Sequence, residues 1–423
     1  MDFARFILEH EHDDPARLAL DRERYACPDF DLRLSTLEAR RKLRDKVPQW
    51  LELPDLRFPS RLSAEQCSSA ETARYKASVA ASLAAGTSLR IADLTGGLGV
   101  DSWAFSQFFS EVLYNEMNPL LADAARHNFA RMGIRNVAVR QEEVGAGRWA
   151  DMLDDFKPDV LYLDPARRAA DGRKVFRIED CRPDLLSLLP ELFRSCPRLL
   201  LKLSPMADIS LVCNQLGPVR EVHVVAAGGE CKELLLVLER DGRHACEKVV
   251  YESGAVLRLR DAAGDDSVSY AAPEDLQGFL FEPGKALLKA GAFDWPSRAF
   301  GLRKIARHTH LYLSAGAVPE DLARFGKCFM LREAVPLNKA GIRYMAAHYP
   351  AAEVSARNLP LTSEELRRKL KVRSGGEVHI FGVHTDTPPA NYLLAAVPCK
   401  ASIMADATAS EAPEPPSNVR TEA

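Results

Sequence analysis

The stretch Asp93-Leu94-Thr95-Gly96-Gly97-Leu98-Gly99 places an acid and closely spaced glycines just after a short apolar run. Gly97 and Gly99 allow a tight turn and bring the backbone close to a ligand, because a Cβ there would collide with it. A dinucleotide-binding turn would need a further glycine at Ser102, and Asp93 would repel a pyrophosphate. An acid at this position instead suits a ligand that carries a cationic amine.

Two more acids follow apolar runs in the same way. Glu116 comes 23 residues after Asp93, and Asp164 follows the run Val160-Leu161-Tyr162-Leu163. Short apolar runs that alternate with helical patterns indicate βαβ units, in which the carboxyl ends of the strands share one crevice. We therefore expect the three acids to line one ligand site.

The turn from Asp93 to Gly99 resembles motif I of the class I S-adenosylmethionine-dependent methyltransferases, with Thr95 where the first glycine often stands. The resemblance implies that S-adenosylmethionine is the cofactor and that Asp93 faces its cationic amine. It also implies that Glu116 accepts both ribose hydroxyls, for which a carboxylate is a natural bidentate acceptor. Glu142 and Glu143 occupy the positions near the adenine amino group in this class.

The loop Asp164-Pro165-Ala166-Arg167-Arg168 is where this class holds the methyl acceptor. It resembles the loop of amino-methylating enzymes, in which an acid takes the hydrogens of the amine, but it lacks the aromatic residue that stacks a flipped base. It also resembles the loop of RNA 5-methyluridine methyltransferases. Those enzymes need a cysteine after the next strand, and residues 200–205 contain none.

Lys202 offers a third alternative for the transfer chemistry. With Asp164, and with Glu230 or Glu233 further along, it resembles the Lys/Asp/Lys/Glu set of ribose 2′-O-methyltransferases. A lysine beside a carboxylate can orient a hydroxyl and help to deprotonate it, although Lys202 could equally be a structural ion pair for Asp164. Asp164, Pro165 and Lys202 are therefore the catalytic candidates, with the acceptor left open between a base amine and a ribose hydroxyl.

The pattern of apolar runs and helical segments around these residues predicts an α/β fold. Its core is expected to be a Rossmann-like seven-stranded sheet of the class I type. The strands are expected at 89–94, 112–116, 137–141, 160–163, 199–203, 221–226 and 234–238. The last one follows too short a link for a parallel crossover, so we expect it to be an antiparallel edge strand. Ser63 is expected to cap a helix from Ala64 towards Ala85.

The whole chain resembles bacterial class I methyltransferases with a C-terminal THUMP-like domain. The matching pieces are 66–69, 93–101, 164–167, 202–205, 229–233 and 357–376, so the resemblance spans roughly residues 60 to 397. We expect an N-terminal helical region (1–86), a methyltransferase domain (87–245), a connecting segment (246–300), a small α+β THUMP-like domain (301–400) and a disordered tail (401–423).

Local basic charge is the sequence signal for a nucleic-acid partner. Residues 302–373 contain 14 Lys/Arg and 6 Asp/Glu, a balance of +8 in a chain whose total is −3. By the THUMP resemblance this region docks RNA, and the expected contacts are Arg367, Arg368, Lys369 and Lys371, with Arg167 and Arg168 at the mouth of the site. A protein or small-molecule methyltransferase and a non-catalytic RNA-binding protein are the alternatives.

The remaining composition is that of an ordinary globular protein. Nine scattered cysteines form no Cys-x-x-Cys pair and no zinc pattern, so we expect reduced thiols and no bound metal. The charged N-terminus cannot act as a signal sequence, and no apolar run reaches transmembrane length. We expect a cytoplasmic protein with no membrane partner, and the sequence leaves its oligomeric state open.

Overall fold

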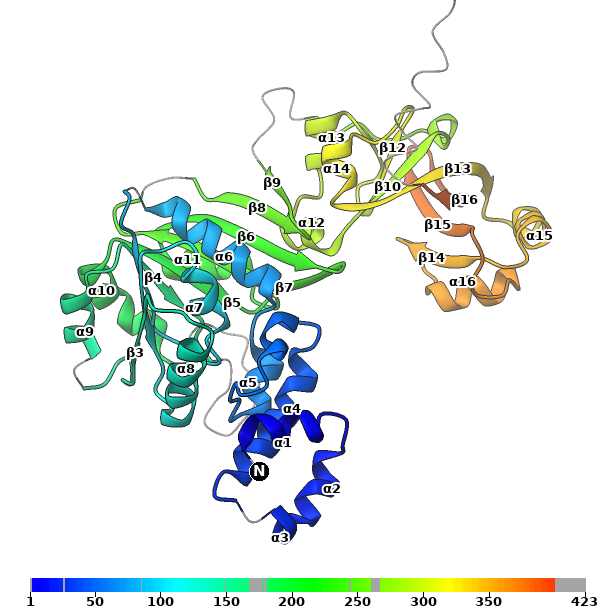
Figure 1. The fold of residues 1–423 in the computed structure, drawn as a ribbon. Coiled ribbons are helices and arrows are strands. Elements are labelled where there is room, and N and C mark those ends of the chain that lie inside the picture. The colour runs from blue at the N-terminus through cyan, green and yellow to red at the C-terminus, as the bar shows by residue number, and fades with distance from the viewer. Residues whose placement is uncertain are drawn as a thin grey trace, which may run out of the picture. The chain divides into compact units, whose positions relative to one another are not determined.

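A computed structural model describes residues 2–25, 27–84, 86–147, 149–166, 178, 181–242, 245–259 and 267–399 (Figure 1). The chain divides into two compact units. The first comprises residues 1–227 and 232–248, and the second comprises 228–231 and the chain from 249 onward. Across the described residues, none of the helices combines the length and the hydrophobicity that crossing a membrane requires. The expected tail, 401–423, lies outside the described residues.

Helices fill the start of the first unit. They are α1 (Phe3–Glu9), α2 (Pro15–Leu20), α3 (Arg22–Tyr25), α4 (Phe30–Leu43), the 3-10 turn η1 (Pro48–Glu52), α5 (Arg61–Gln66) and α6 (Ala70–Leu83). The prediction of one helix capped by Ser63 is wrong. Ser60 caps α5 and Ser69 caps α6, because their hydroxyls accept the N–H groups of Ser63 and Thr72. This second cap breaks the helix and leaves an extended segment, 67–69, between the two.

The central sheet confirms the predicted fold class. Its first seven strands are β1 (Arg90–Asp93), β2 (Glu111–Asn115), β3 (Val137–Arg140), β4 (Val160–Leu163), β5 (Arg198–Leu203), β6 (Val219–Ala227) and β7 (Glu230–Glu239). The strand order is β3-β2-β1-β4-β5-β7-β6-β8-β9, with parallel pairing from β3 to β5. The added strands β8 (Glu247–Glu252) and β9 (Ala255–Leu259) make a sheet of nine, which extends the expected seven.

The direction of β7 is as predicted, but its position is not. It runs antiparallel to β5 and lies between β5 and β6, so it is no edge strand. Gly228 and Gly229 have φ of +62° and +73°, which makes a tight turn that folds β7 directly back along β6. Residues 233–238 are all buried, as expected of a strand covered on both faces.

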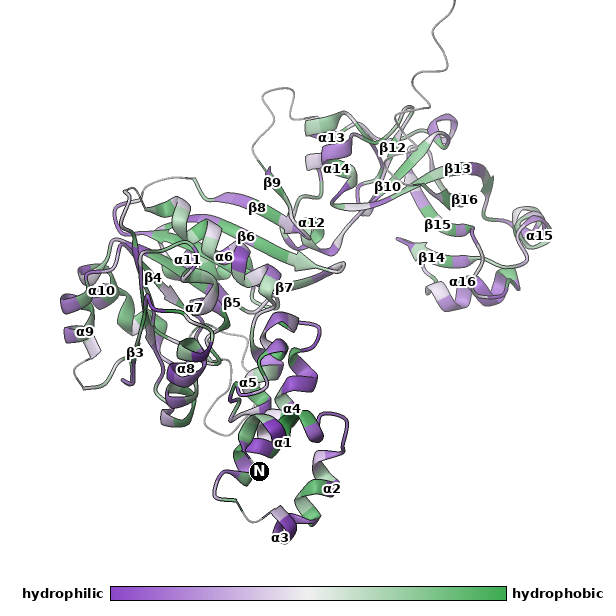
Figure 2. Ribbon diagram, in the orientation of Figure 1, coloured by the Kyte–Doolittle hydropathy of each residue, from purple (hydrophilic) through white to green (hydrophobic). Residues whose placement is uncertain are grey.

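Helices alternate with the parallel strands and bring the chain back across the sheet. They are α7 (Val100–Phe105), α8 (Pro119–Arg131), α9 (Trp149–Phe156), α10 (Leu185–Ser195) and α11 (Ile209–Leu216). Asn118, Asp184 and Asp208 cap α8, α10 and α11 by accepting backbone N–H groups of the first turn. The central strands are predominantly apolar (Figure 2), and every residue of β4 is buried. A rigid core thus supports the carboxyl ends of β1, β2, β4 and β5.

The second unit contains a sheet of its own, in the order β11-β12-β10-β13-β16-β15-β14. Its elements are β10 (Phe279–Pro283), α12 (Lys285–Lys289), α13 (Trp295–Phe300), β11 (Arg303–Ala306), β12 (Thr309–Ser314), α14 (Glu320–Ala323), β13 (Gly326–Pro336), α15 (Lys339–His348), β14 (Glu353–Arg357), α16 (Ser363–Leu370), β15 (His379–Asp386) and β16 (Pro389–Pro398). Much of the expected connecting segment is therefore folded, since β8 to β10 and α12 to α13 fall within residues 246–300.

Candidate active site

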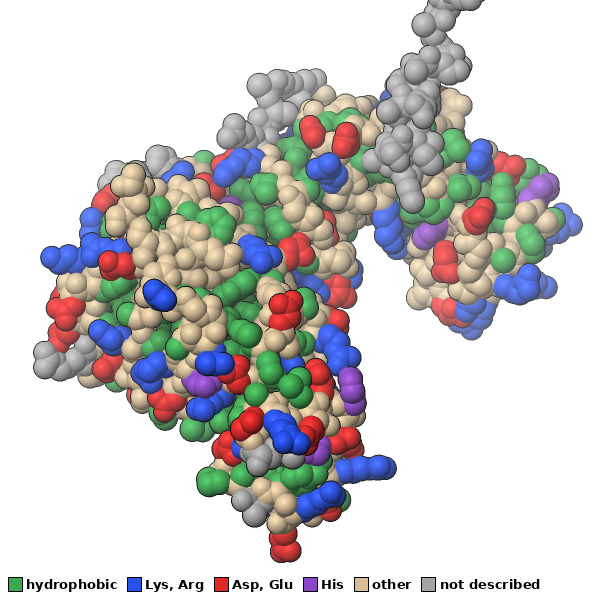
Figure 3. Space-filling view, viewed as in Figure 1, with side chains coloured by type: hydrophobic (Ala, Val, Ile, Leu, Met, Phe, Trp, Pro, Cys, Tyr) green, Lys and Arg blue, Asp and Glu red, His purple; other side chains and the backbone are tan. Residues whose placement is uncertain are grey.

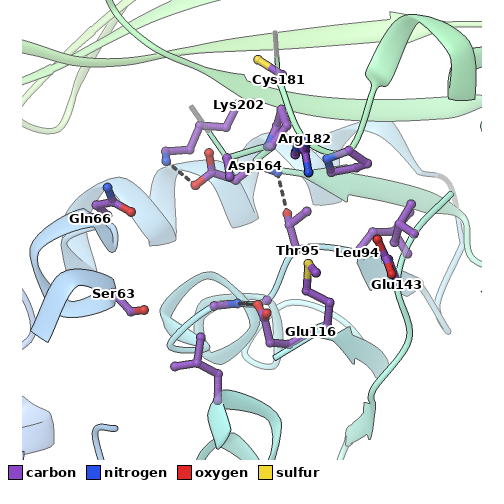
Figure 4. A pocket seen from close by; sticks show the side chains of 18 of the residues that line it. Ser63, Gln66, Leu94, Thr95, Glu116, Glu143, Asp164, Cys181, Arg182 and Lys202 are labelled. Carbon is purple, nitrogen blue, oxygen red and sulfur yellow. Dashed lines mark hydrogen bonds and ion pairs between the residues drawn. The ribbon is translucent and has the colours of Figure 1, made fainter. Parts of the chain in front are cut away.

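A cavity of about 960 Å³ lies in the first unit at the carboxyl ends of β1, β2, β4 and β5 (Figure 4). The other wall comes from α5 and the segment before α6, which contribute Gln66 and Ser68. The charged side chains that line the cavity are Asp101, Glu116, Glu142, Glu143, Asp164, Asp184, Arg182 and Lys202. Because acids predominate, the cavity suits a ligand with cationic groups.

The glycine turn forms the floor of this cavity and fixes Glu116. Gly97 and Gly99 have φ of +54° and +86°, a backbone conformation that other residues rarely adopt. The N–H of Gly97 donates to Glu116 Oε2 at 2.9 Å, and the N–H of Asn118 donates to Oε1 at 2.9 Å. The carboxylate therefore has a fixed orientation at the cavity wall before any ligand arrives.

Asp93 does not face the cavity, which corrects the expectation that it meets the amine of the ligand. Its side chain is buried and is absent from the cavity wall. One oxygen accepts the hydroxyl of Ser102 at 2.7 Å, and the other accepts the N–H of Thr95 at 3.1 Å. Burial raises the pKa of Asp93 to about 8. Asp93 thus ties the turn to the start of α7.

Thr95 has a function in the fold that the first glycine of the motif could not supply. Its hydroxyl accepts the backbone N–H of Asp164 at 2.7 Å. This hydrogen bond joins the turn after β1 to the loop after β4 (Figure 4). A glycine would leave that N–H without its side-chain acceptor.

Glu142 and Glu143 line the cavity beyond β3, and both are exposed. A residue that the sequence did not indicate, Asn115, holds this segment in place. Its side chain accepts the N–H of Glu142 at 2.9 Å and donates to the carbonyl oxygens of Glu142 at 3.0 Å and Leu94 at 3.3 Å. The amide of Asn115 therefore links the ends of β1, β2 and β3.

Asp164 and Lys202 meet at the far side of the cavity and form an ion pair (Figure 4). Lys202 Nζ also lies 4.0 Å from Glu233, which is 3% exposed, whereas Glu230 is exposed at the start of β7. The structure therefore identifies Glu233, and not Glu230, as the glutamate near Lys202.

A second lysine, Lys76 of α6, continues this chain of charges and is fully buried. Its Nζ lies 3.2 Å from Glu233 and 2.9 Å from Asp101 Oδ1. Burial alone would lower the pKa of Lys76, but Asp101 and Glu233 outweigh it and raise that pKa above its ordinary value. The result is a continuous alternation of charge from Asp164 through Lys202, Glu233 and Lys76 to Asp101.

The loop after β4 begins and ends at the cavity. Pro165 and Ala166 line it, and Ala166 pairs with Arg182 through backbone hydrogen bonds of 2.7 and 3.1 Å. This pairing closes the base of the loop, so Cys181 and Arg182 also line the cavity. The predicted contacts Arg167 and Arg168 lie outside the described residues.

The basic character of residues 302–373 is weaker in the structure than in the sequence. Lys304 is buried and lies 2.8 Å from Asp294, Arg357 lies 2.6 Å from Glu282, and Arg303 pairs with Asp275. All three acids come from outside that stretch of sequence, so they offset part of the +8 balance. The face in Figure 3 shows acidic side chains interspersed among the basic ones.

The four predicted RNA contacts of the second unit lie on α16 and at its end. Arg367 lies 2.8 Å from Glu364, which is also 3.9 Å from Arg368. Lys369 and Lys371 are exposed. Leu366 and Leu370 are buried and anchor the helix to the sheet. The exposed positive charge therefore concentrates at the C-terminal end of α16.

Sequence reasoning missed Lys76, Asp101 and Asn115. The sequence did contain a signal for Lys76, because a lysine among the small apolar residues of a helix face requires a buried partner. That partner, Glu233, lies 157 residues further along the chain. Pairing at such a separation cannot be read from local spacing.

The sheet order, the glycine turn and the acid after β2 together define a class I S-adenosylmethionine-dependent methyltransferase. Comparisons with known proteins agree. An uncharacterized S-adenosylmethionine-dependent methyltransferase of Mycobacterium tuberculosis is 24% identical over 330 residues, which cover 77% of this chain and 82% of that protein. A crystal structure of a proposed methyltransferase from Porphyromonas gingivalis W83 is 31% identical, with a TM-score of 0.80 over 94% of this chain and 98% of that one.

Two domain models match the second unit. Residues 279–320 match a ferredoxin-like domain, and residues 326–394 match a THUMP domain-like family. The chain therefore belongs to the family of S-adenosylmethionine-dependent methyltransferases that carry a THUMP-like domain at the C-terminal end. It is an enzyme, and its cofactor is S-adenosylmethionine.

Proposed function

We propose that the protein methylates RNA and that the acceptor is a ribose hydroxyl. The observation that carries this proposal is the Asp164–Lys202 ion pair at the cavity, continued inward by Glu233 and Lys76. These four residues have the composition of the Lys/Asp/Lys/Glu set that the sequence suggested for hydroxyl methylation. Lys76 supplies the member that the sequence did not indicate.

The residues of the cavity fit the cofactor. Glu116, oriented by two backbone N–H groups, would accept the ribose hydroxyls, and Glu142 and Glu143 would lie at the adenine end. The glycine turn leaves room for a close approach of the ligand to the backbone. When bound there, S-adenosylmethionine supplies an electrophilic methyl group.

The charge of Lys202 favours a hydroxyl acceptor over an amine. An amine gains positive charge as it attacks a methyl group, and the adjacent ammonium group of Lys202 opposes that change. A hydroxyl gains negative charge as it loses its proton, and the same ammonium group stabilises it. Asp164, 30% exposed and held by Lys202, is placed to take that proton.

An RNA partner is supported by the THUMP-like match and by the exposed lysines of α16. THUMP domains in other enzymes bind RNA, and phosphate groups attract a cluster of exposed lysines. The substrate would then be a structured RNA that the second unit docks and the first unit methylates.

The test is transfer of labelled methyl groups to total RNA from a strain that lacks the gene, followed by nucleoside mass spectrometry. We expect a 2′-O-methylated nucleoside that appears with native protein. Asp164→Asn and Lys202→Met should each lower turnover by roughly 100-fold or more, the usual contribution of a positioned acid–base group, while cofactor binding persists. Asp123→Asn, at an exposed acid of α8 that does not line the cavity, is the control and should retain transfer.

A methylated base amine would overturn the hydroxyl assignment. Labelling of protein or of a small molecule, with none in RNA, would overturn the substrate class.

A further inference from the structure

Arg182 is a cavity residue that neither the sequence nor the proposed transfer reaction uses. It is exposed, and it lines the cavity together with Asp164 (Figure 4). Among the described residues of the cavity wall it is one of two cations, and the other is Lys202. Lys202 already pairs with Asp164 and lies 4.0 Å from Glu233, whereas no acid of the described chain lies within ion-pair distance of Arg182.

The backbone of Arg182 is fixed beside the catalytic candidates. Its carbonyl oxygen accepts the N–H of Ala166 at 2.7 Å, and its own N–H donates to the carbonyl oxygen of Ala166 at 3.1 Å. Ala166 is two residues from Asp164. Asp184, two residues beyond Arg182, instead caps α10 by accepting the N–H of Ser187 at 3.3 Å. The guanidinium group of Arg182 therefore stays free to bind an anion at the cavity wall.

An RNA substrate meets electrostatic repulsion at this cavity. Six of the eight charged residues in its wall are acids, and phosphate groups are negative as well. Glu142 and Glu143 are exposed, so they repel a phosphate group that approaches. Bringing a nucleotide close to Asp164 therefore requires a cation near its phosphate group. Among the described cavity residues, Arg182 is the cation that is not already paired.

We propose that Arg182 binds the phosphate group on the 3′ side of the acceptor nucleotide. This inference rests on the proposed ribose methylation, and it names the part of the RNA backbone that the cavity itself recognises. A guanidinium group presents its N–H donors in a planar fork, which matches two oxygens of a phosphate group. Arg182 thereby offsets the surrounding acids at the point where the nucleotide enters.

The chemistry of RNA determines which phosphate group is within reach. The 2′-hydroxyl that Asp164 would deprotonate is attached to C2′, and the 3′-phosphate is attached to the adjacent carbon, C3′. The 5′-phosphate is attached to C5′, beyond C4′, and is more distant. Because Arg182 pairs with Ala166, two residues from Asp164, the group that Arg182 binds must lie close to the reacting hydroxyl. The 3′-phosphate meets this requirement.

The test measures binding of mononucleotides to the full chain by ligand-observed NMR, without RNA. The protein is saturated with S-adenosylhomocysteine, which keeps adenosine compounds out of the cofactor part of the cavity. Nucleoside 3′-monophosphates should bind native protein roughly tenfold or more tightly than the same nucleosides, the scale of a hydrogen bond to a charged group, and more tightly than 5′-monophosphates. Arg182→Met should remove this preference. Arg182→Lys keeps the charge but not the fork, so it should retain part of the preference.

Arg140→Met is the matched control, because it removes the same charge from an exposed arginine of β3 that does not line the cavity. This variant should keep the preference for 3′-monophosphates. Arg182→Met should fold, since the described hydrogen bonds of Arg182 come from its backbone, which the substitution retains. The affinity for S-adenosylhomocysteine, measured by calorimetry, should be the same in Arg182→Met and in native protein.

In RNA, a neutral methylphosphonate on the 3′ side of the methylated nucleotide should lower kcat/KM roughly tenfold in native protein and have little effect in Arg182→Met. A preference for 3′-monophosphates that is absent from native protein, or unchanged in Arg182→Met, would overturn the proposal. Weaker binding of S-adenosylhomocysteine by Arg182→Met would also overturn it, because Arg182 would then hold the cofactor. Failure of RNA methylation with the phosphate preference intact would overturn only the proposed function.

Discussion

Glu116 and Asp93 are both acids at strand ends, yet their surroundings give them opposite properties. Glu116 is partly exposed at the cavity, and its carboxylate receives two backbone N–H groups. Asp93 is buried behind the turn. We therefore expect the same residue class to serve ligand binding in one place and local structure in the other.

At the residue scale, Glu116→Ala should weaken binding of S-adenosylhomocysteine by about 1.5–3 kcal/mol, the cost of losing hydrogen bonds to a charged group. Calorimetry measures the change. Glu143→Ala is the comparison, because that side chain is exposed and should contribute less. Equal affinities for native protein and the Glu116 variant would contradict the proposed ribose contact.

The raised pKa of Asp93 predicts that the stability of the protein depends on pH. Its folded-state pKa of about 8 lies above the ordinary value of 3.8, so the unfolded chain ionises first as pH rises. The contribution of Asp93 to stability is present below the ordinary pKa and is lost as pH rises towards about 8. The Asp93→Asn variant has no carboxyl group to ionise at this position. Its free energy of unfolding should therefore fall less than that of native protein over this pH range. Urea unfolding at pH 5 and pH 8 tests this, and parallel losses in the two proteins would contradict it.

At the scale of elements, Thr95 joins two loops that the sheet places side by side. Thr95→Val keeps the shape and removes the acceptor for the Asp164 N–H. An unsatisfied buried N–H costs about 1–3 kcal/mol, so the variant should unfold at lower denaturant and transfer methyl groups more slowly. Thr95→Ser keeps the hydroxyl and should resemble native protein in both measurements. Full activity in Thr95→Val would show that this link does not position Asp164.

At the scale of the whole molecule, the exposed end of α16 should govern the electrostatic part of RNA binding. Neutralising Arg367, Arg368, Lys369 and Lys371 should flatten the slope of log affinity against log salt on bulk tRNA, because fewer counterions are released. Cofactor affinity should not change. Arg303 and Arg357 already pair with Asp275 and Glu282. Neutralising these two arginines should flatten the salt slope less for each charge removed. An unchanged slope in the α16 variant would contradict docking through this helix.

The sequence alone determined the α/β class, the glycine turn, the strand-end acids and the cofactor, because each depends on local spacing along βαβ units. Asp93 and Glu116 were both found this way, although spacing could not tell which one faces the cavity. Burial of a side chain depends on segments that pack over it, and for Asp93 that means α7, through Ser102.

Only the tertiary structure decided the arrangement of buried charge. The turn at Gly228 and Gly229 inserts β7 between β5 and β6, and this brings Glu233 to both Lys202 and Lys76. The pair of Lys76 and Glu233 joins residues 157 positions apart, and no local pattern encodes such a contact. Charges buried in a low-dielectric interior must find partners wherever the fold supplies them, so their pairing is fixed by packing and not by spacing.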